Sequence, residues 1–400
     1  MSESAISVLV PGVRLGVARA GIKYPDRRDL VLIEVNPGAS CAAVFTRNAF
    51  CAAPVTVAKQ NLSVTAPRYL VINTGNANAG TGKAGLDTAT ATCAAVAAIA
   101  NCRAEEVLPF STGVIGEPLP IDRLSAALPE AFARLSETGW DDAAWGIMTT
   151  DTRPKLVSRQ LSGPGGTITI TGIAKGAGMI KPDMATMLAF IATDAELQAP
   201  LLQSCLKEAV AGSFNAITVD GDTSTNDACV LLATGRSGIQ IQKRDALYPD
   251  FVEIVQDLCI ELAQALIRDG EGATKFLTIR VEQGRDVAEC RQVAYTVAHS
   301  PLVKTAFFAS DPNWGRILAA VGRSGLDQLG LENISIYLDE ICIVRNGGRA
   351  SDYSETLGQA VMKRTDITIR IQLGRGSAAT KIWTTDLSHD YIRINAEYRT

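Results

Sequence analysis

Histidine is scarce in this sequence, and its scarcity limits the chemistry that the chain can perform. His299 and His389 are the two histidines among 400 residues. A metal site built from several histidines is therefore excluded, and a histidine-dependent triad would have to use one of these two. The nine cysteines are odd in number and contain no Cys-x-x-Cys spacing, so we interpret them as reduced packing residues, with a catalytic cysteine as a minor alternative. We expect neither a bound metal nor a resident cofactor.

The sequence also lacks a basic cluster and a long apolar run. The chain has thirty-eight lysines and arginines and forty-two acidic residues, which gives a net charge of −4. This balance makes nucleic acid a poor candidate partner. The first residues have no basic segment, and Pro11 ends a short apolar stretch, which is not typical of a secretory signal. The Ala-rich run at 92–100 is too short to span a bilayer. We therefore expect a cytoplasmic protein without a membrane partner, and small charged metabolites remain open as ligands.

Hydrophobic residues make up 47% of the chain and charged residues 20%, which is ordinary for a globular enzyme. Alternating apolar and polar residues or short apolar runs predict strands, and apolar residues at helical spacing predict helices. The predicted strands are 29–35, 41–46, 69–73, 107–110, 167–173, 333–338, 367–373, 381–385 and 391–395. The predicted helices are 83–101, 121–135, 199–211 and 248–267. Because no regular strand–helix–strand rhythm appears, the sequence predicts an α+β fold of layered sheets and helices.

Two polar, glycine-flanked segments resemble known ligand loops but do not match them. Residues 75–83 lack the first glycine and the final Ser or Thr of a phosphate loop, since Ala77 and Ala84 stand there. Residues 220–227 lack the glycine and the bidentate glutamate of a calcium loop, since Thr225 and Leu231 stand there. Their composition is typical of backbone that approaches a ligand, and pocket lining and plain turn both remain open.

The most unusual segment runs from Lys175 to Phe190. Glycines and Pro182 lead into Met184-Ala-Thr-Met-Leu188, which continues as an apolar strand. A threonine between a loop and a strand is well placed to act as a nucleophile. Composition alone favours the alternative that Thr186 is simply a β-favouring residue.

The segment resembles the self-processing signature of the ornithine acetyltransferase (glutamate N-acetyltransferase) family, with Asp183 where that family carries Asn. The similarity extends along nearly the whole chain. Its further matches are Gly75-Asn-Ala-Asn-Ala-Gly80, Ser111-Thr-Gly-Val-Ile-Gly116, Met148-Thr-Thr-Asp-Thr-Arg-Pro-Lys155, residues 213–227, Asp269-Gly-Glu-Gly-Ala-Thr-Lys275, Ser310-Asp-Pro-Asn-Trp-Gly-Arg316 and the tail 386–400.

The resemblance implies an N-terminal-nucleophile enzyme that cleaves itself between Ala185 and Thr186. The α fragment, 1–185, would carry the oxyanion hole and part of the substrate pocket. The β fragment, 186–400, would begin with the nucleophile and end in a docked tail. A free α-amine has a pKa of about 8, so Thr186 could supply its own general base without an imidazole.

The resemblance also implies the reaction and its residues. Thr186 would carry an acetyl group from N-acetylornithine to glutamate by a ping-pong mechanism in arginine biosynthesis, with Thr112 and Gly113 as the oxyanion hole. The implied substrate-binding residues are Thr152, Lys175, Thr186, Glu271, Asn395 and Thr400. We assign Lys175 to a substrate carboxylate and Glu271 to an ammonium group; by themselves both are typical of solvated surface charges. Thr152 is chosen over Thr149 and Thr150.

Two further expectations accompany the resemblance. We expect the bifunctional form, which also uses acetyl-coenzyme A to acetylate glutamate, and a heterotetramer of two α and two β fragments. The rival within enzymes is a self-processing aminopeptidase that uses the same threonine with water as acceptor. The rival from another class is an uncleaved ligand-binding protein that has lost the chemistry.

Overall fold

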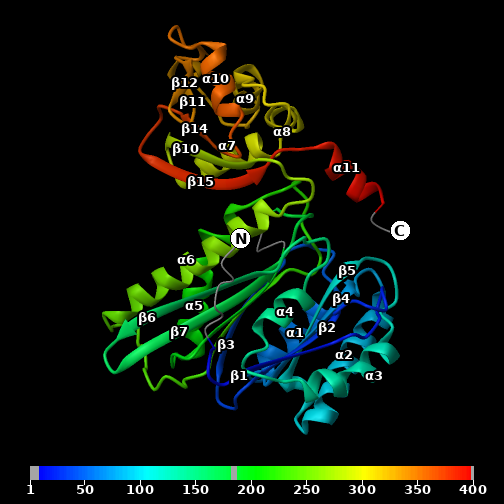
Figure 1. Cartoon of the computed structure of the whole chain (residues 1–400). Helices are drawn as coiled ribbons and strands as arrows, with labels where there is room; N and C mark the ends of the chain where they lie inside the picture. The colour runs from blue at the N-terminus through cyan, green and yellow to red at the C-terminus, as the bar shows by residue number, and fades with distance from the viewer. Residues whose placement is uncertain (1–8, 182–186, 398–400) are drawn as a thin grey trace. The chain divides into compact units, whose positions relative to one another are not determined.

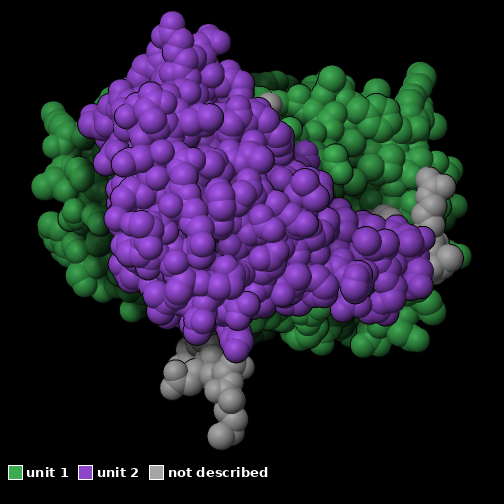
Figure 2. All heavy atoms as spheres, turned by 90° about the horizontal axis from the view of Figure 1, so that it is seen from above, with its two compact units in different colours: residues 1–215, 222–266 green, residues 216–221, 267–400 purple. Residues whose placement is uncertain are grey.

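The computed structural model describes residues 9–181 and 187–397 (Figure 1). The chain divides into two compact units, coloured separately in Figure 2. The first unit comprises residues 1–215 and 222–266, and the second comprises 216–221 and 267–400. Each unit has its own sheets and its own buried apolar residues. Among the described residues, no helix is long and apolar enough to cross a membrane.

The first unit contains a four-stranded sheet with the order β1-β2-β4-β5. Its strands are β1 (Val13–Ala18), β2 (Leu30–Val35), β4 (Tyr69–Asn76) and β5 (Val107–Val114). The first two pairings are antiparallel, and β4 with β5 is parallel. A parallel pair needs a long crossover, and α2 (Gly82–Ala100) supplies it. Helices α1 (Ala53–Val64), α2 and α3 (Ile121–Ala133) pack on this sheet through an apolar cluster that includes Val57, Cys93 and Leu128.

The second sheet of this unit has five strands in the order β3-β9-β8-β7-β6. They are β3 (Ser40–Phe45), β9 (Ala228–Ala233), β8 (Leu188–Thr193), β7 (Gly166–Lys175) and β6 (Lys155–Gly163). Strands β8 and β9 are parallel and buried along their whole length, as expected for an apolar strand covered on both faces. Helix α5 (Ala199–Ala211) packs on β3, and α6 (Leu247–Arg268) packs on β7, where Leu258 lies over Gly172.

The two sheets of the first unit face each other across a shared core. Phe110 of β5 meets Phe190 of β8 edge to face, with ring centroids 5.1 Å apart. Apolar side chains of both sheets and of α4 (Trp140–Gly146) join this cluster. The layers therefore run helix, sheet, sheet, helix. This arrangement confirms the predicted α+β fold of layered sheets and helices.

The second unit is built on a six-stranded sheet with the order β13-β12-β11-β14-β10-β15. Its strands are β10 (Phe276–Gly284), β11 (Ser335–Leu338), β12 (Ile341–Arg345), β13 (Gly348–Arg349), β14 (Asp366–Gln372) and β15 (Ala378–Thr385). Its helices are α7 (Val287–Ala298), α8 (Pro301–Phe308), α9 (Trp314–Gly322), α10 (Glu355–Met362) and α11 (His389–Ala396). Short 3₁₀ turns occupy Ala104–Glu106, Phe214–Ala216 and Leu331–Asn333.

Most predicted elements are present, and one is wrong. The helix predicted at 199–211 has those bounds, and β7 contains the strand predicted at 167–173. Residues 391–395 form part of helix α11 instead of a strand, because Ser388 caps the helix by accepting a hydrogen bond from the Tyr391 N–H. The alternation of polar and apolar residues there is misleading, since Ile392 is 63% exposed. The helix predicted at 83–101 is present as α2. We expected it to be buried, but only one of its faces is.

The predicted fragments do not coincide with the compact units. Strand β7 precedes the Ala185–Thr186 bond and β8 follows it, and the two strands pair along six residues in one sheet. Cleavage of that bond would therefore leave two fragments that share a sheet and a core. The cleavage itself stays a prediction, because Ala185 and Thr186 lie outside the described residues.

Candidate active site

The segment Ser111-Thr-Gly113 lies at the carboxyl end of β5, beside the same end of β4. Gly113 is in register with Gly75, and its φ of 136° is one that side-chain-bearing residues rarely adopt. A Cβ atom on Gly113 would lie 2.3 Å from the carbonyl carbon of Gly75. Two backbones therefore approach each other so closely that this position requires glycine. Thr112 is 8% exposed.

Side-chain amides hold the loop that follows β4. Asn73 donates from Nδ2 to the carbonyl oxygen of Asn76 at 2.8 Å and accepts a 2.6 Å hydrogen bond from the Ser111 hydroxyl. Asn76 accepts from the Asn78 N–H at 2.8 Å and donates to the carbonyl oxygen of Glu117 at 3.1 Å. The asparagines satisfy backbone groups of a buried turn, which explains the composition of residues 75–80.

The two segments that only partly match ligand loops lie next to each other. Asn226 donates from Nδ2 to the carbonyl oxygens of Ala77 at 2.6 Å and Ser111 at 2.9 Å. The Ala52 N–H donates to the carbonyl oxygen of Thr225. The loop 222–227 is therefore anchored to the end of β5 and to the loop after β4.

The segment that leads away from the predicted nucleophile enters the sheet at the same end. The Ala228 N–H donates to the Met187 carbonyl oxygen at 3.0 Å. Leu188 is in register with Lys175 of β7 and with Ala228 of β9. Because Asn226 and Ala228 are two residues apart, Met187 and the end of β5 lie at one end of the two facing sheets. Thr186, the residue before Met187, lies outside the described residues.

Lys175 belongs to a buried polar cluster at the end of β7. Its ammonium group donates to the Thr149 hydroxyl at 3.3 Å, and its residue is 9% exposed. Asp151 forms an ion pair with Lys155 and accepts a 2.7 Å hydrogen bond from the Gly176 N–H. Burial alone would raise the pKa of the Asp151 carboxyl, but the charges of Lys155 and Lys175 and these hydrogen bonds outweigh it and lower the pKa. Asp151 is therefore a carboxylate near neutral pH.

The structure places the Thr149 hydroxyl beside the Lys175 ammonium group. Thr152 is exposed, whereas Thr149 is half-buried. Thr152 therefore stays a prediction, and Thr149 is a residue of the cluster that the sequence analysis passed over.

Asp227 is a second carboxyl that the sequence analysis did not single out as functional. It is 4% exposed and begins the entry into β9, next to Asn226. Burial raises the pKa of its carboxyl well above the usual value, although Ser224 hydrogen bonds and the Lys175 charge oppose this shift. The signal for Asp151 was its place in the matched stretch Met148–Lys155, and for Asp227 its place in 213–227, but sequence alone could not separate turn residues from buried ones.

The second unit brings Glu271 and Asn395 together. Asn395 of α11 donates from Nδ2 to Glu271 Oε2 at 2.7 Å. The Ser388 hydroxyl donates to the Gly272 carbonyl oxygen at 2.7 Å, and the Tyr391 hydroxyl lies 3.2 Å from Asp220 Oδ2. Helix α11 is therefore docked by polar contacts beside Glu271, which is 8% exposed. Thr400 lies outside the described residues.

The two histidines make structural contacts within the second unit. His299 stacks on Tyr295, and its Nε2 lies 3.0 Å from the Thr218 hydroxyl. His389 meets Phe308 edge to face.

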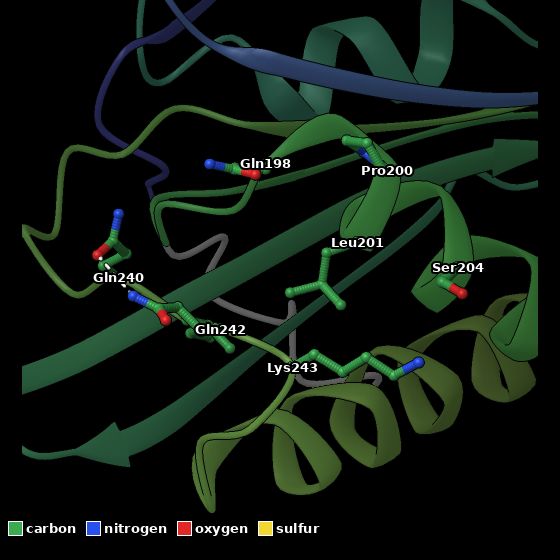
Figure 3. A pocket seen from close by; sticks show the side chains of 8 residues that line it. Gln198, Pro200, Leu201, Ser204, Gln240, Gln242 and Lys243 are labelled. Atoms are coloured by element: carbon green, nitrogen blue, oxygen red, sulfur yellow. Dashed lines mark hydrogen bonds between the residues drawn. The ribbon is translucent and has the colours of Figure 1, made fainter.

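Described residues of the first unit line at least two pockets. One of about 260 Å³ is lined by the loop after β4 and the start of α2, including Asn78, Gly80 and Thr81, so this loop is both a turn and a pocket wall. A larger one of about 540 Å³ lies beside the start of α5, where Leu201 and Lys243 line it together with Gln198, Gln240 and Gln242 (Figure 3). None of the predicted site residues lines it. Among the described residues, no group of three His, Cys, Asp or Glu side chains is placed to hold a metal ion.

Comparison with known proteins identifies the family. The ArgJ family model matches residues 14–400. The arginine biosynthesis bifunctional protein ArgJ of Methylococcus capsulatus is 59% identical over 392 residues, which cover 98% of this chain and 96% of that protein. ArgJ of Pseudomonas fluorescens is 55% identical over 393 residues, with 98% and 97% covered. The crystal structure of the arginine biosynthesis bifunctional protein ArgJ from Bacillus halodurans is 37% identical, covers 53% of this chain and 99% of that chain, and has a TM-score of 0.51. The chain described in this structure therefore belongs to the ArgJ family.

Proposed function

We propose that this protein is an acetyltransferase of arginine biosynthesis that moves an acetyl group from N-acetylornithine to glutamate. Family membership over nearly the whole chain supports the reaction. The observation that supports the site is the convergence of Thr112-Gly113, Lys175 and Met187 at one end of two facing sheets. Family membership also favours transfer to glutamate over the hydrolysis performed by an aminopeptidase.

The first step is self-cleavage. The Thr186 hydroxyl attacks the carbonyl carbon of Ala185, the peptide nitrogen leaves as an amine, and water then hydrolyses the ester. The products are residues 1–185 and 186–400. The new α-amine of Thr186 serves as the general base, because its pKa of about 8 allows it to accept a proton near neutrality.

Acetyl transfer follows in two half-reactions. The Thr186 hydroxyl attacks the acetyl carbon of N-acetylornithine while its α-amine takes the proton. Ornithine leaves with that proton, and the amine of glutamate then attacks the acetyl-threonine ester. Each half passes through a tetrahedral oxyanion, for which the Thr112 hydroxyl and the Gly113 N–H are the donors; one such donor is worth roughly a hundredfold in rate.

Charged residues would orient the substrates. The Lys175 ammonium group binds a substrate carboxylate, and the Glu271 carboxylate, held by Asn395, binds a substrate ammonium group. Thr152 and Thr400 complete this set. We further propose that acetyl-coenzyme A is a second acetyl donor, that the fragments assemble as a heterotetramer, and that the protein works in the cytoplasm.

Denaturing mass analysis of the wild-type protein and a Thr186→Ala variant tests this proposal. We expect two wild-type fragments of about 20 and 23 kDa, by division of 42.3 kDa in the ratio of 185 to 215 residues, and an uncut variant. Purified wild-type protein should then release ornithine repeatedly only when glutamate is present, and without glutamate the release should stop at one ornithine per site. An uncut wild-type chain, or repeated ornithine release without glutamate, would contradict the proposal.

A further inference from the structure

A buried ion pair lies in the first unit beside the end of β7. The side chains of Asp151 and Lys155 are 0% and 1% exposed, and they form a direct salt bridge. Removing two charges from water is costly, and a buried pair often stabilises a fold no better than apolar side chains of the same size would. A contribution to folding stability is therefore a weak explanation for this buried pair. The groups around it suggest a different role.

Asp151 holds two backbone segments together. One carboxylate oxygen accepts a hydrogen bond from the Gly176 N–H at 2.7 Å, and the other accepts from the Thr149 N–H at 3.0 Å. Gly176 is where the chain leaves β7, with a φ of 149° that side-chain-bearing residues rarely adopt. Lys155 begins β6 and is in register with Ala174. The carboxylate thus joins the turn at 149–151 to the exit from β7.

The same carboxylate controls the surroundings of Lys175. The ammonium group of Lys175 donates to the Thr149 hydroxyl at 3.3 Å, and the Thr149 backbone is held by Asp151. The negative charge of Asp151 also acts directly on Lys175. Both the backbone after Lys175 and a hydroxyl that accepts from its ammonium group therefore depend on Asp151.

We propose that Asp151, neutralised by Lys155, is a positioning residue of the acetyl-transfer site. It holds the Lys175 ammonium group where a substrate carboxylate binds, and it fixes Gly176, from which the chain runs towards the Ala185–Thr186 bond. This inference rests on the proposed function for the role of Lys175. It gives a functional role to Asp151 and Lys155, which would otherwise be regarded as purely structural residues of the segment Met148–Lys155.

A neutral pair tests this role without leaving one member of the Asp151–Lys155 pair charged and buried alone. The variant Asp151→Asn/Lys155→Met removes both charges at similar volume, whereas either single change would bury an uncompensated charge. We expect the KM for N-acetylornithine to rise at least tenfold, with a smaller change in kcat. Hydrogen exchange of the peptide that contains Gly176 should become faster.

A double-mutant cycle with Lys175→Met separates positioning from a general loss of structure. If Asp151 acts through Lys175, the neutral pair will cause little further rise in KM in the Lys175→Met background, because its effect has already been lost. Independent effects would multiply instead. A matched control is Arg159→Met/Glu261→Gln, which neutralises a partly exposed ion pair of β6 and α6 and should leave KM unchanged.

The outcomes are distinct. A folded neutral-pair variant with unchanged KM, or effects that multiply with Lys175→Met, would overturn the inference. If the neutral pair does not fold, Thr149→Val removes the hydroxyl that accepts from Lys175 and should raise KM three- to tenfold; unchanged KM would again overturn it. A cleaved wild-type protein that transfers no acetyl group would instead contradict the proposed function, and hydrogen exchange at Gly176 would then decide whether Asp151 holds this backbone.

Discussion

Asn226 and Ser111 are joined by a 2.9 Å hydrogen bond from the side-chain amide to the carbonyl oxygen, and this bond links the entry of β9 to the end of β5. The same amide nitrogen also donates to Ala77. One side chain therefore fixes the loop after β4 and the segment that carries Thr112 and Gly113. The geometry of the proposed oxyanion segment thus depends on a side chain that is far from it in the sequence.

The variant Asn226→Ala should weaken both the fold and the reaction. Two buried carbonyl oxygens would lose their donor, at a cost of about 1–3 kcal/mol each. We expect a decrease of about 2–5 kcal/mol in the free energy of unfolding and a lower kcat. Urea unfolding and acetyl-transfer assays measure these effects. The control is Asn48→Ala, which removes half-buried or exposed hydrogen bonds with Thr223 of the same loop and with the Phe50 N–H, and should cost less, about 1–2 kcal/mol. Equal effects of the two variants would contradict this role for Asn226.

The variant Gly113→Ala should abolish acetyl transfer. Its Cβ would clash with the Gly75 backbone, so β4 and β5 would separate at the proposed oxyanion donors Thr112 and Gly113. We expect at least a hundredfold loss of kcat, the usual effect of losing an oxyanion donor. Gly116→Ala is the matched control, because Gly116 also has a positive φ, of 86°, but open space around it. This control should lose about 1–2 kcal/mol of stability and retain its activity. Full activity of Gly113→Ala would contradict the predicted oxyanion hole.

The variant Asn395→Asp should release helix α11 from Glu271. The amide nitrogen of Asn395 now donates to the Glu271 carboxylate at 2.7 Å, and the variant would replace it with a second carboxylate. Two negative charges at about this distance repel each other. Helix α11 has no fully buried residue, so its position depends on polar contacts, and eight residues are too few for a stable isolated helix. We expect faster hydrogen exchange in 389–396 and a several-fold higher KM for N-acetylornithine. Ile392→Ala, at a side chain that is 63% exposed, should leave both unchanged; a matching rise in KM there would show that the Asn395–Glu271 contact is not responsible.

Lys304 should make the free energy of unfolding depend on pH in the alkaline range. Burial lowers the pKa of its ammonium group from 10.5 to about 8, partly opposed by Asp386 and Asp220. Above pH 10.5 the group is neutral in the folded and unfolded chains, so it carries no penalty. As the pH falls towards 8, the unfolded chain binds a proton that the folded chain does not, and stability decreases. At about 1.4 kcal/mol per pKa unit, the difference across this window is about 3 kcal/mol.

Comparison with Lys304→Met isolates this effect. Other groups titrate in the same pH range, but they contribute equally to both proteins. Relative to the variant, the wild-type protein should gain about 3 kcal/mol of unfolding free energy between pH 8 and pH 10.5. Urea unfolding at several pH values measures the difference. A constant difference across the window would show that the Lys304 pKa is not lowered.

Much of the layered fold follows from local patterns in the sequence. Three elements follow directly from their local patterns. Alternating Thr and Ile residues predict β7, an apolar run predicts β8, and apolar residues at helical spacing predict α5. The strand predicted at 391–395 is wrong because a two-residue period also occurs by chance in a short exposed helix, and the cap at Ser388 decides the outcome. Family motifs located Thr112, Lys175, Thr186, Glu271 and Asn395 along the chain.

The sequence by itself determined the α+β class, the scarcity of histidine that excludes a metal site built from several histidines, and the ordered motifs of the ArgJ family. The tertiary structure alone decided which polar residues are buried and what they hold. Asp151 and Lys155 look like an exposed pair in sequence, and Asn226 looks like a turn residue. The physical reason is that desolvation and hydrogen-bond satisfaction depend on chain segments far apart in sequence, such as 149–155 with 175–176 and 77 with 226, which only the folded chain brings together.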